Sequence, residues 1–150
     1  MAKKAPKTVL PPPECKAVLL CERVLVDPFT GLYSVINIFD NIIVYDDHAV
    51  VGPYRLYVEL TGGSGQYLIA VEIQELEESM LLGKEERAIT LTDRSEKWIG
   101  VFEVPAFEVW ADGSYEIVVF ADGEPVGQRG ISIIDGREAE DGEEKGSGES

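Results

Sequence analysis

The stretch from Val109 to Ile134, VWADGSYEIVVFADGEPVGQRGISII, decides the fold. Two runs rich in β-branched and aromatic residues, 114–121 and 124–134, flank the dipeptide Asp122-Gly123. Asp-Gly between such runs is a strong signal for a β-hairpin, because its two-residue turn needs positive φ at both positions. The stretch therefore predicts two antiparallel strands that end an all-β protein.

The turn also predicts a register for these two strands. Counting outward from Asp122-Gly123 places Phe120 opposite Pro125 and Glu116 opposite Arg129, an exposed pair of opposite charges. Proline cannot donate a backbone hydrogen bond within a sheet. We therefore expect the last strand to lie at a sheet edge near Pro125.

The rest of the chain repeats the β pattern in short runs separated by turn residues. The expected strands are Ala17–Val26, Leu32–Ile43, Tyr54–Leu60, Tyr67–Ile73, Leu81–Leu91 and Trp98–Val104. Asp27-Pro28-Phe29-Thr30-Gly31 is a turn that joins the first two of them into a hairpin. No segment keeps a period of 3.6 residues, so seven to eight strands in a sandwich or barrel are expected.

A short motif narrows the choice to one kind of sandwich. Asp112-Gly113-Ser114-Tyr115 resembles the corner that opens a late strand in immunoglobulin-like domains. The expected fold is therefore an immunoglobulin-like antiparallel β-sandwich with disordered termini. We divide the chain into a flexible Lys/Pro-rich arm (1–14), a single domain (15–134) and a disordered acidic tail (135–150).

Charge and cysteine content limit the partners. The chain of 150 residues has a formal net charge of −15, which disfavours direct binding to nucleic acid or to anionic membranes. Cys15 and Cys21 are six residues apart along one expected strand, roughly 20 Å, so they cannot form a disulfide with each other. Free thiols fit a reducing cytoplasm, and no run is long enough for a membrane span.

Candidate chemistry is sparse. His48 is the only histidine. Any Ser-His-Asp triad would therefore have to use His48, and sites that need two imidazoles are excluded. Asp40, Asp46, Asp47 and His48 are weak candidates for a calcium or other metal site, and an exposed polar loop is the alternative reading. The sequence indicates no catalytic residue and no cofactor. The glycine-rich run 61–65 lacks the Lys-Ser/Thr of a phosphate loop.

The aromatic segment around Pro105 has two readings. Phe107 and Trp110 form either a possible interaction patch for a protein or carbohydrate, or a crossover whose aromatic rings close one end of the sandwich. The exposure of the two side chains distinguishes these readings.

The first hairpin also carries a family resemblance. Residues 20–31, with Ser34 and Ile38-Phe39-Asp40, resemble a family of small bacterial proteins known only as a domain of unknown function. Residues 60–63 and 113–123 share the similarity, which covers roughly residues 17–134. The resemblance implies an immunoglobulin-like sandwich in a bacterial cytoplasm and implies no activity, cofactor or catalytic residue.

These observations favour a non-enzymatic interaction or accessory module with an unknown protein partner. The alternative is a small-ligand or calcium-binding sandwich that uses the region from Asp40 to His48, and an enzyme with two unrecognised carboxylates comes third.

Overall fold

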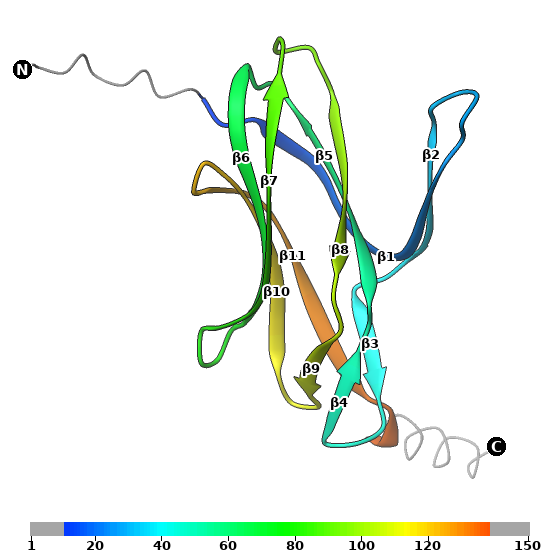
Figure 1. The fold of residues 1–150 in the computed structure, drawn as a ribbon. Coiled ribbons are helices and arrows are strands. Elements are labelled where there is room, and N and C mark those ends of the chain that lie inside the picture. Colours follow the sequence, from blue (N-terminus) through cyan, green and yellow to red (C-terminus); the bar gives the residue numbers. More distant parts are fainter. Residues whose placement is uncertain (1–10, 139–150) are drawn as a thin grey trace, which may run out of the picture.

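The computed structural model describes residues 11–138, which fold into two packed β-sheets and a short ribbon (Figure 1). Eleven strands lie within these residues: β1 (Glu14–Val26), β2 (Tyr33–Ile38), β3 (Asn41–Val44), β4 (His48–Val51), β5 (Tyr54–Thr61), β6 (Gly65–Glu75), β7 (Met80–Leu91), β8 (Trp98–Val104), β9 (Phe107–Trp110), β10 (Ser114–Ala121) and β11 (Glu124–Asp135). The expected antiparallel β-sandwich is confirmed. Its strands outnumber the seven to eight expected, because segments that we read as one strand or as a loop form additional short strands.

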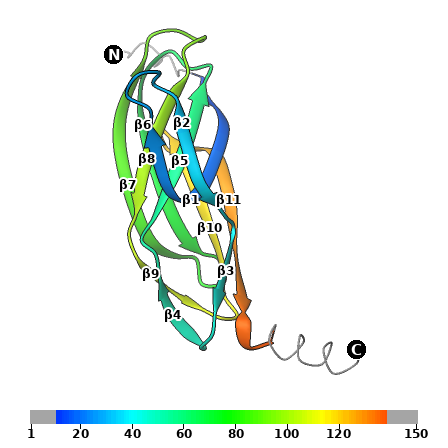
Figure 2. The ribbon, with the colours of Figure 1, turned by 90° about the vertical axis from the view of Figure 1, so that its right-hand side faces the viewer.

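The sheets have the strand orders β2-β1-β5-β8 and β3-β11-β10-β6-β7, and the view in Figure 2 shows both sheets running along the long axis. All pairs are antiparallel except β3 with β11, which is parallel. β4 and β9 pair with each other in a ribbon that closes one end of the sandwich (Figure 1).

The core forms from alternate residues of strands that we expected to alternate. Leu56, Val58 and Leu60 of β5 are fully buried. On the other sheet the alternate residues of β6 are also buried, namely Tyr67, Ile69, Val71 and Ile73. Both sets belong to one continuous hydrophobic cluster. The period of two therefore identified the inward faces of these strands correctly.

The expected strand from Leu32 to Ile43 is wrong as a single element. It is divided into β2 and β3, which belong to different sheets. Asn37 adopts a positive φ of 58°, which interrupts the extended backbone. Asp40 then accepts a hydrogen bond from Ser132 N through its carbonyl oxygen at 2.8 Å, which attaches the chain to β11.

The closing hairpin has the expected turn and a different register beyond it. Asp122 and Gly123 both have positive φ, and Phe120 lies opposite Pro125 as expected. A β-bulge follows, in which Val126 has no partner, so every later pair shifts by one residue. The expected pairing of Glu116 with Arg129 is therefore wrong.

The bulge gives Arg129 a different role. Arg129 lies opposite Ile117, a core residue, so its side chain is on the inward face. Its guanidinium donates a hydrogen bond to the carbonyl oxygen of Val18 at 3.1 Å and lies 3.8 Å from the carboxylate of Asp40. Arg129 thus connects β11 with β1 of the opposite sheet.

The expected sheet edge at Pro125 is confirmed. β3 pairs with β11 only along residues 132–135. The part of β11 that contains Pro125 has β10 as its single neighbour among the described strands. The missing N–H of Pro125 therefore breaks no ladder on the free side.

The corner before β10 has the expected tyrosine geometry. Trp110 N donates a hydrogen bond to Tyr115 Oη at 2.8 Å, a bond that runs back to the backbone a few residues upstream. A Cβ at Gly113 would collide with the tyrosine ring and hydroxyl. Glycine is thus required for Tyr115 to fold over the corner.

The described chain enters and leaves at opposite ends of the sandwich (Figure 1). Pro13 is buried, and Tyr67 Oη donates a hydrogen bond to the carbonyl oxygen of Pro11 at 2.9 Å. The last residues of the expected flexible arm (1–14) therefore lie against the domain, and Glu14 already belongs to β1. Residues 136–138 form one helical turn; the remainder of the expected arm and tail, 1–10 and 139–150, lies outside the described residues.

Candidate functional site

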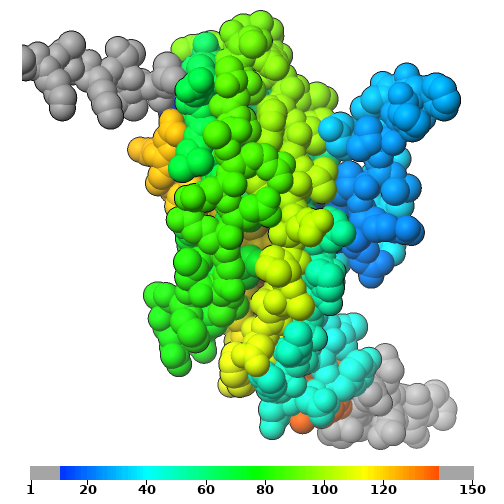
Figure 3. Space-filling model, viewed as in Figure 1, coloured from blue at the N-terminus to red at the C-terminus, as the bar shows by residue number. Residues whose placement is uncertain are grey.

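The most unusual surface of the molecule is the hairpin formed by β1 and β2. Its outer half stands off the body of the sandwich, as the blue atoms in Figure 3 show. The turn is built as the sequence predicts: Asp27 Oδ1 accepts hydrogen bonds from Phe29 N at 2.8 Å and Thr30 N at 3.3 Å, and Gly31 has a φ of 72°. The Asp27 N–H donates to Leu32 O at 2.9 Å and closes the loop.

The end of this hairpin is apolar and exposed. Phe29 is 96% exposed and Leu32 is 68% exposed, while Leu25 and Val26 on β1 are each about half exposed. We call these four residues the hairpin tip. Among residues 24–39 the only charged side chain is Asp27, whose carboxylate oxygen is engaged by the turn. The tip is therefore a hydrophobic surface in a strongly acidic protein.

A second apolar surface lies at the base of the same hairpin. A groove of about 420 Å³ is lined by Glu22, Asn37, Ile38, Phe39, Asn41, Ile42, Ile43 and Tyr54. The rings of Phe39 and Tyr54 pack edge to face, with centroids 4.7 Å apart. Ile38 and Ile43 are each about half exposed. We call this surface the basal groove.

The four metal candidates are not brought together as a site. Asp40 faces Arg129, and Asp47 Oδ1 accepts a hydrogen bond from Arg137 at 2.8 Å. His48 Nε2 lies 3.0 Å from Glu108 Oε2. Within residues 11–138 no three His, Cys, Asp or Glu side chains lie close enough to hold a metal ion. Asp40 and Asp47 thus each have an arginine as neighbour, and Asp46 precedes Asp47 in the loop between β3 and β4.

Phe107 and Trp110 lie in different environments. The segment we read as an irregular crossover is the strand β9, which pairs with β4. Phe107 is buried in the core at 6% exposure, so it cannot belong to a surface patch. Trp110 is 43% exposed, and its ring centroid lies 5.0 Å from that of His48. Of the possible interaction patch, only Trp110 is available to a partner.

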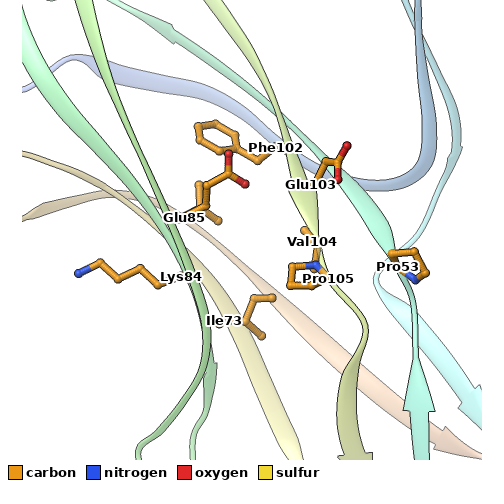
Figure 4. A pocket seen from close by; sticks show the side chains of 10 residues that line it. Pro53, Ile73, Lys84, Glu85, Phe102, Glu103, Val104 and Pro105 are labelled. Carbon is orange, nitrogen blue, oxygen red and sulfur yellow. The ribbon is translucent and has the colours of Figure 1, made fainter.

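Another groove, of about 310 Å³, runs between β7 and β8 (Figure 4). These are edge strands of different sheets and do not pair with each other. Its floor is apolar, with Ile73 and Val104, and Glu85 and Glu103 lie at its rim. Glu85 is 3.0 Å from Arg87, and Glu103 is 3.9 Å from Arg55. Each rim carboxylate therefore has an arginine within ion-pair distance.

Arg87 also covers the open side of the core next to this groove. Its guanidinium lies 4.2 Å from the centre of the Phe102 ring and donates a hydrogen bond to Val101 O at 3.1 Å. The arginine of β7 thus bridges to β8 through a cation–π contact and a hydrogen bond. Phe102 is fully buried, although it belongs to an edge strand.

A third hollow lies near the β9–β10 corner, and half of its lining residues are acidic. It is lined by Glu75, Glu77, Glu78, Met80, Trp110, Asp112, Gly113 and Tyr115. The buried Glu75 carboxylate accepts hydrogen bonds from the backbone N–H groups of Glu77 and Glu78, at 3.0 and 2.8 Å, so it caps the β6–β7 turn. Burial, and then the nearby carboxylates, raise the pKa of Tyr115.

The two thiols are not activated. Cys15 and Cys21 are both free, and burial raises the pKa of each. A thiol becomes a good nucleophile when its surroundings lower its pKa. Neither cysteine has the environment of a catalytic nucleophile.

Comparison of the sequence with protein-family models and with curated proteins gave no match. The resemblance to the small bacterial family therefore stays a prediction. Within the described residues no helix has the length and apolar character that crossing a membrane requires.

Sequence reasoning missed the hairpin tip and the basal groove as surfaces. It read residues 17–43 as two ordinary sandwich strands, for which apolar side chains are expected to be buried. The long interval without charge from Val24 to Phe39 was the available signal, interrupted only by Asp27. Such an interval fits a buried strand equally well, so the pattern alone could not locate the surface.

Proposed function

We propose that this protein is a non-enzymatic interaction module that binds a protein partner through the hairpin tip. The observation that carries the proposal is the exposure of Phe29, Leu32, Leu25 and Val26 together at the end of one projecting hairpin. Large exposed apolar side chains that gather at one place on an otherwise polar surface are typical of interaction sites.

The chemistry of the tip fits a protein surface as its partner. Burying a Phe or Leu side chain is worth about 1.5–3 kcal/mol each, so covering the four tip residues supplies several kcal/mol of binding energy. The hydrogen bonds of Asp27 hold the turn in one conformation before binding. A preordered tip loses less conformational entropy when a partner covers it.

The acidic body favours selective contact through this one region. Net charge of −15 repels other acidic surfaces, while the tip is nearly free of charge. The proposal includes a reducing cytoplasm as the compartment, in keeping with the two free thiols. The rim carboxylates with their arginine neighbours, and the thiols whose pKa burial raises, support the non-enzymatic part of the proposal.

Site-specific photocrosslinking in cells of the native organism tests the proposal. A photoreactive amino acid at Phe29 should crosslink a protein, and the matched position Leu81, which is 54% exposed on β7, should not. The double variant Phe29→Ser, Leu32→Ser should abolish a crosslink formed from Val26. Equal crosslinking from Phe29 and Leu81, or none from either, would contradict the proposal.

A further inference from the structure

The edge strand β2 carries none of the residues that usually block pairing with another strand. Among the other sheet edges only β3 also lacks them, and its four residues make a short edge, which is itself a protection. β7 carries the run Lys84-Glu85-Glu86-Arg87, and β11 has Pro125 on its free edge. Charged residues and proline are the usual means by which proteins block edge strands. From Leu32 to Phe39, in contrast, the chain has no charge, proline or glycine.

The backbone of β2 presents free hydrogen-bonding groups on its outer side. The bond from Asp27 N to Leu32 O makes these two residues a hydrogen-bonded pair of the hairpin. Because such pairs alternate, Ser34 and Ile36 point their backbone groups toward β1. The N–H and C=O groups of Tyr33 and Val35 therefore point away from β1, where the described chain provides no strand.

The hairpin also lacks support of its own. None of the six residues of β2 is buried, although four of them are Tyr, Val or Ile. A two-stranded hairpin alone in water is marginally stable, and here the ring of Tyr33 packs on Tyr57 of β5, with the ring centroids 5.9 Å apart, while the turn beyond it is exposed. A further strand that covers β2 would satisfy its backbone and bury its side chains.

We propose that β2 pairs antiparallel with β2 of a second copy of this chain, which joins two four-stranded sheets into one across a twofold axis. The inference rests on the proposed function, since it names the partner of the same hairpin. Centring the pair on Val35 places the outward N–H and C=O groups of Val35 in the two copies opposite each other. In that register residue 35 − k lies opposite residue 35 + k, so Leu32 faces Ile38 of the other copy.

The register brings complementary surfaces together. The hairpin tip of each copy lies next to the basal groove of the other, because Leu32 and Gly31 lie opposite Ile38 and Phe39 of the second chain. Each copy thus contributes one apolar projection and one groove lined mainly by Ile, Phe and Tyr side chains, in which the Glu22 carboxylate accepts a hydrogen bond from Asn37. A twofold interface requires such self-complementarity, since the same patch serves on both subunits.

Charge selects this face for self-association. Two chains of −15 repel each other over most of their surfaces, and the interval 32–39 offers two identical strands a contact without like charges. Since salt screens the repulsion between the bodies, the dimer should tighten as ionic strength rises.

Sedimentation velocity of the purified full chain over a range of concentrations and salt tests the inference. The wild type should be a dimer that tightens with salt. Val35→Pro removes an outward N–H and spares the bonds to β1, and Ile38→Lys places a charge beside Leu32 of the other copy; each should weaken dimerisation at least tenfold. Leu81→Lys, at a comparably exposed position on the other sheet, should leave it unchanged, with circular dichroism confirming the fold of each variant.

The outcomes separate this inference from the proposed function. A purified chain that stays monomeric up to millimolar concentration, while photoreactive Phe29 captures a different protein in cells, overturns the dimer and leaves the interaction module standing. A dimer that Leu81→Lys dissociates and Ile38→Lys does not would also overturn the inference. A monomer whose Phe29 captures nothing contradicts both proposals.

Discussion

Tyr115 shows how one hydrogen bond holds the corner between β9 and β10. Its hydroxyl accepts from the Trp110 N–H, and Gly113 leaves the space for its ring. The variant Tyr115→Phe keeps the ring and leaves that N–H without its acceptor. We expect the free energy of unfolding to fall by about 1–2 kcal/mol.

Chemical denaturation measures this loss, and Tyr45→Phe is its control, because Tyr45 is more than half exposed. That variant should change stability by less than about 0.5 kcal/mol. Equal effects of the two substitutions would contradict a structural role of the corner bond.

The residues between Asp40 and His48 permit a second prediction at this scale. Arg129 and Arg137 lie beside Asp40 and Asp47, and their positive charges disfavour a divalent cation there. We expect millimolar calcium to leave the melting temperature unchanged. A thermal-shift assay measures the melting temperature, with magnesium as the control for general ionic effects. A rise in melting temperature that is specific to calcium would support the calcium-binding alternative.

Among the elements, the bulge in β11 decides which charged residues matter. Arg129 bridges two sheets through Val18, whereas Glu116 lies opposite Gly130. Arg129→Gln should lower the free energy of unfolding by about 2 kcal/mol, since a hydrogen bond from a charged group is lost in a half-buried site. Glu116→Gln should stay within about 0.5 kcal/mol.

The double variant measures the register directly. Denaturation of Glu116→Gln, Arg129→Gln should give the sum of the two single effects, because the residues are not partners. A clear coupling energy between them would instead support the hairpin without a bulge.

The same hairpin shows what a sequence can predict. The turn at Asp122-Gly123, the edge at Pro125 and the corner at Tyr115 follow from local backbone chemistry, and the structure has all three. The bulge at Val126 is followed by Gly127, which lies against Cys15 and Val18 of β1, and no local pattern encodes this meeting of distant segments. The separation of β2 from β3 has the same cause, since Asn37 and Asp40 change direction to reach a distant strand.

The candidate sites show a similar division. The sequence showed that Phe107 and Trp110 were candidates for a surface patch. Only tertiary packing determines that Phe107 lies in the core and that Trp110 is exposed to solvent. The hairpin tip escaped notice because exposed and buried apolar strands have the same sequence pattern.

At the scale of the whole molecule, stability should depend on alkaline pH. Burial raises the pKa of Cys15, Cys21, Tyr54, Tyr57 and Tyr115 in the folded state. The unfolded chain ionises its thiols near pH 8.5 and its phenols near about pH 10. Above those values it releases protons that the folded chain still holds, so the free energy of unfolding falls as pH rises.

Denaturant titrations from neutral pH to about pH 11 should show constant stability up to about pH 8.5 and a progressive loss above it. The variant Cys15→Ser, Cys21→Ala should move the onset toward the range in which tyrosine ionises. Constant stability across the whole range would contradict the raised values.

The entry and exit of the described chain at opposite ends of the sandwich have a mechanical consequence. Tension applied through the two ends runs along the strands of both sheets. Such a load shears the hydrogen-bond ladders, whose bonds must break together rather than one after another as in peeling. Linked in series with other domains, this sandwich would behave as a stiff spacer, while the projecting hairpin lies outside the line of force and remains free for contact.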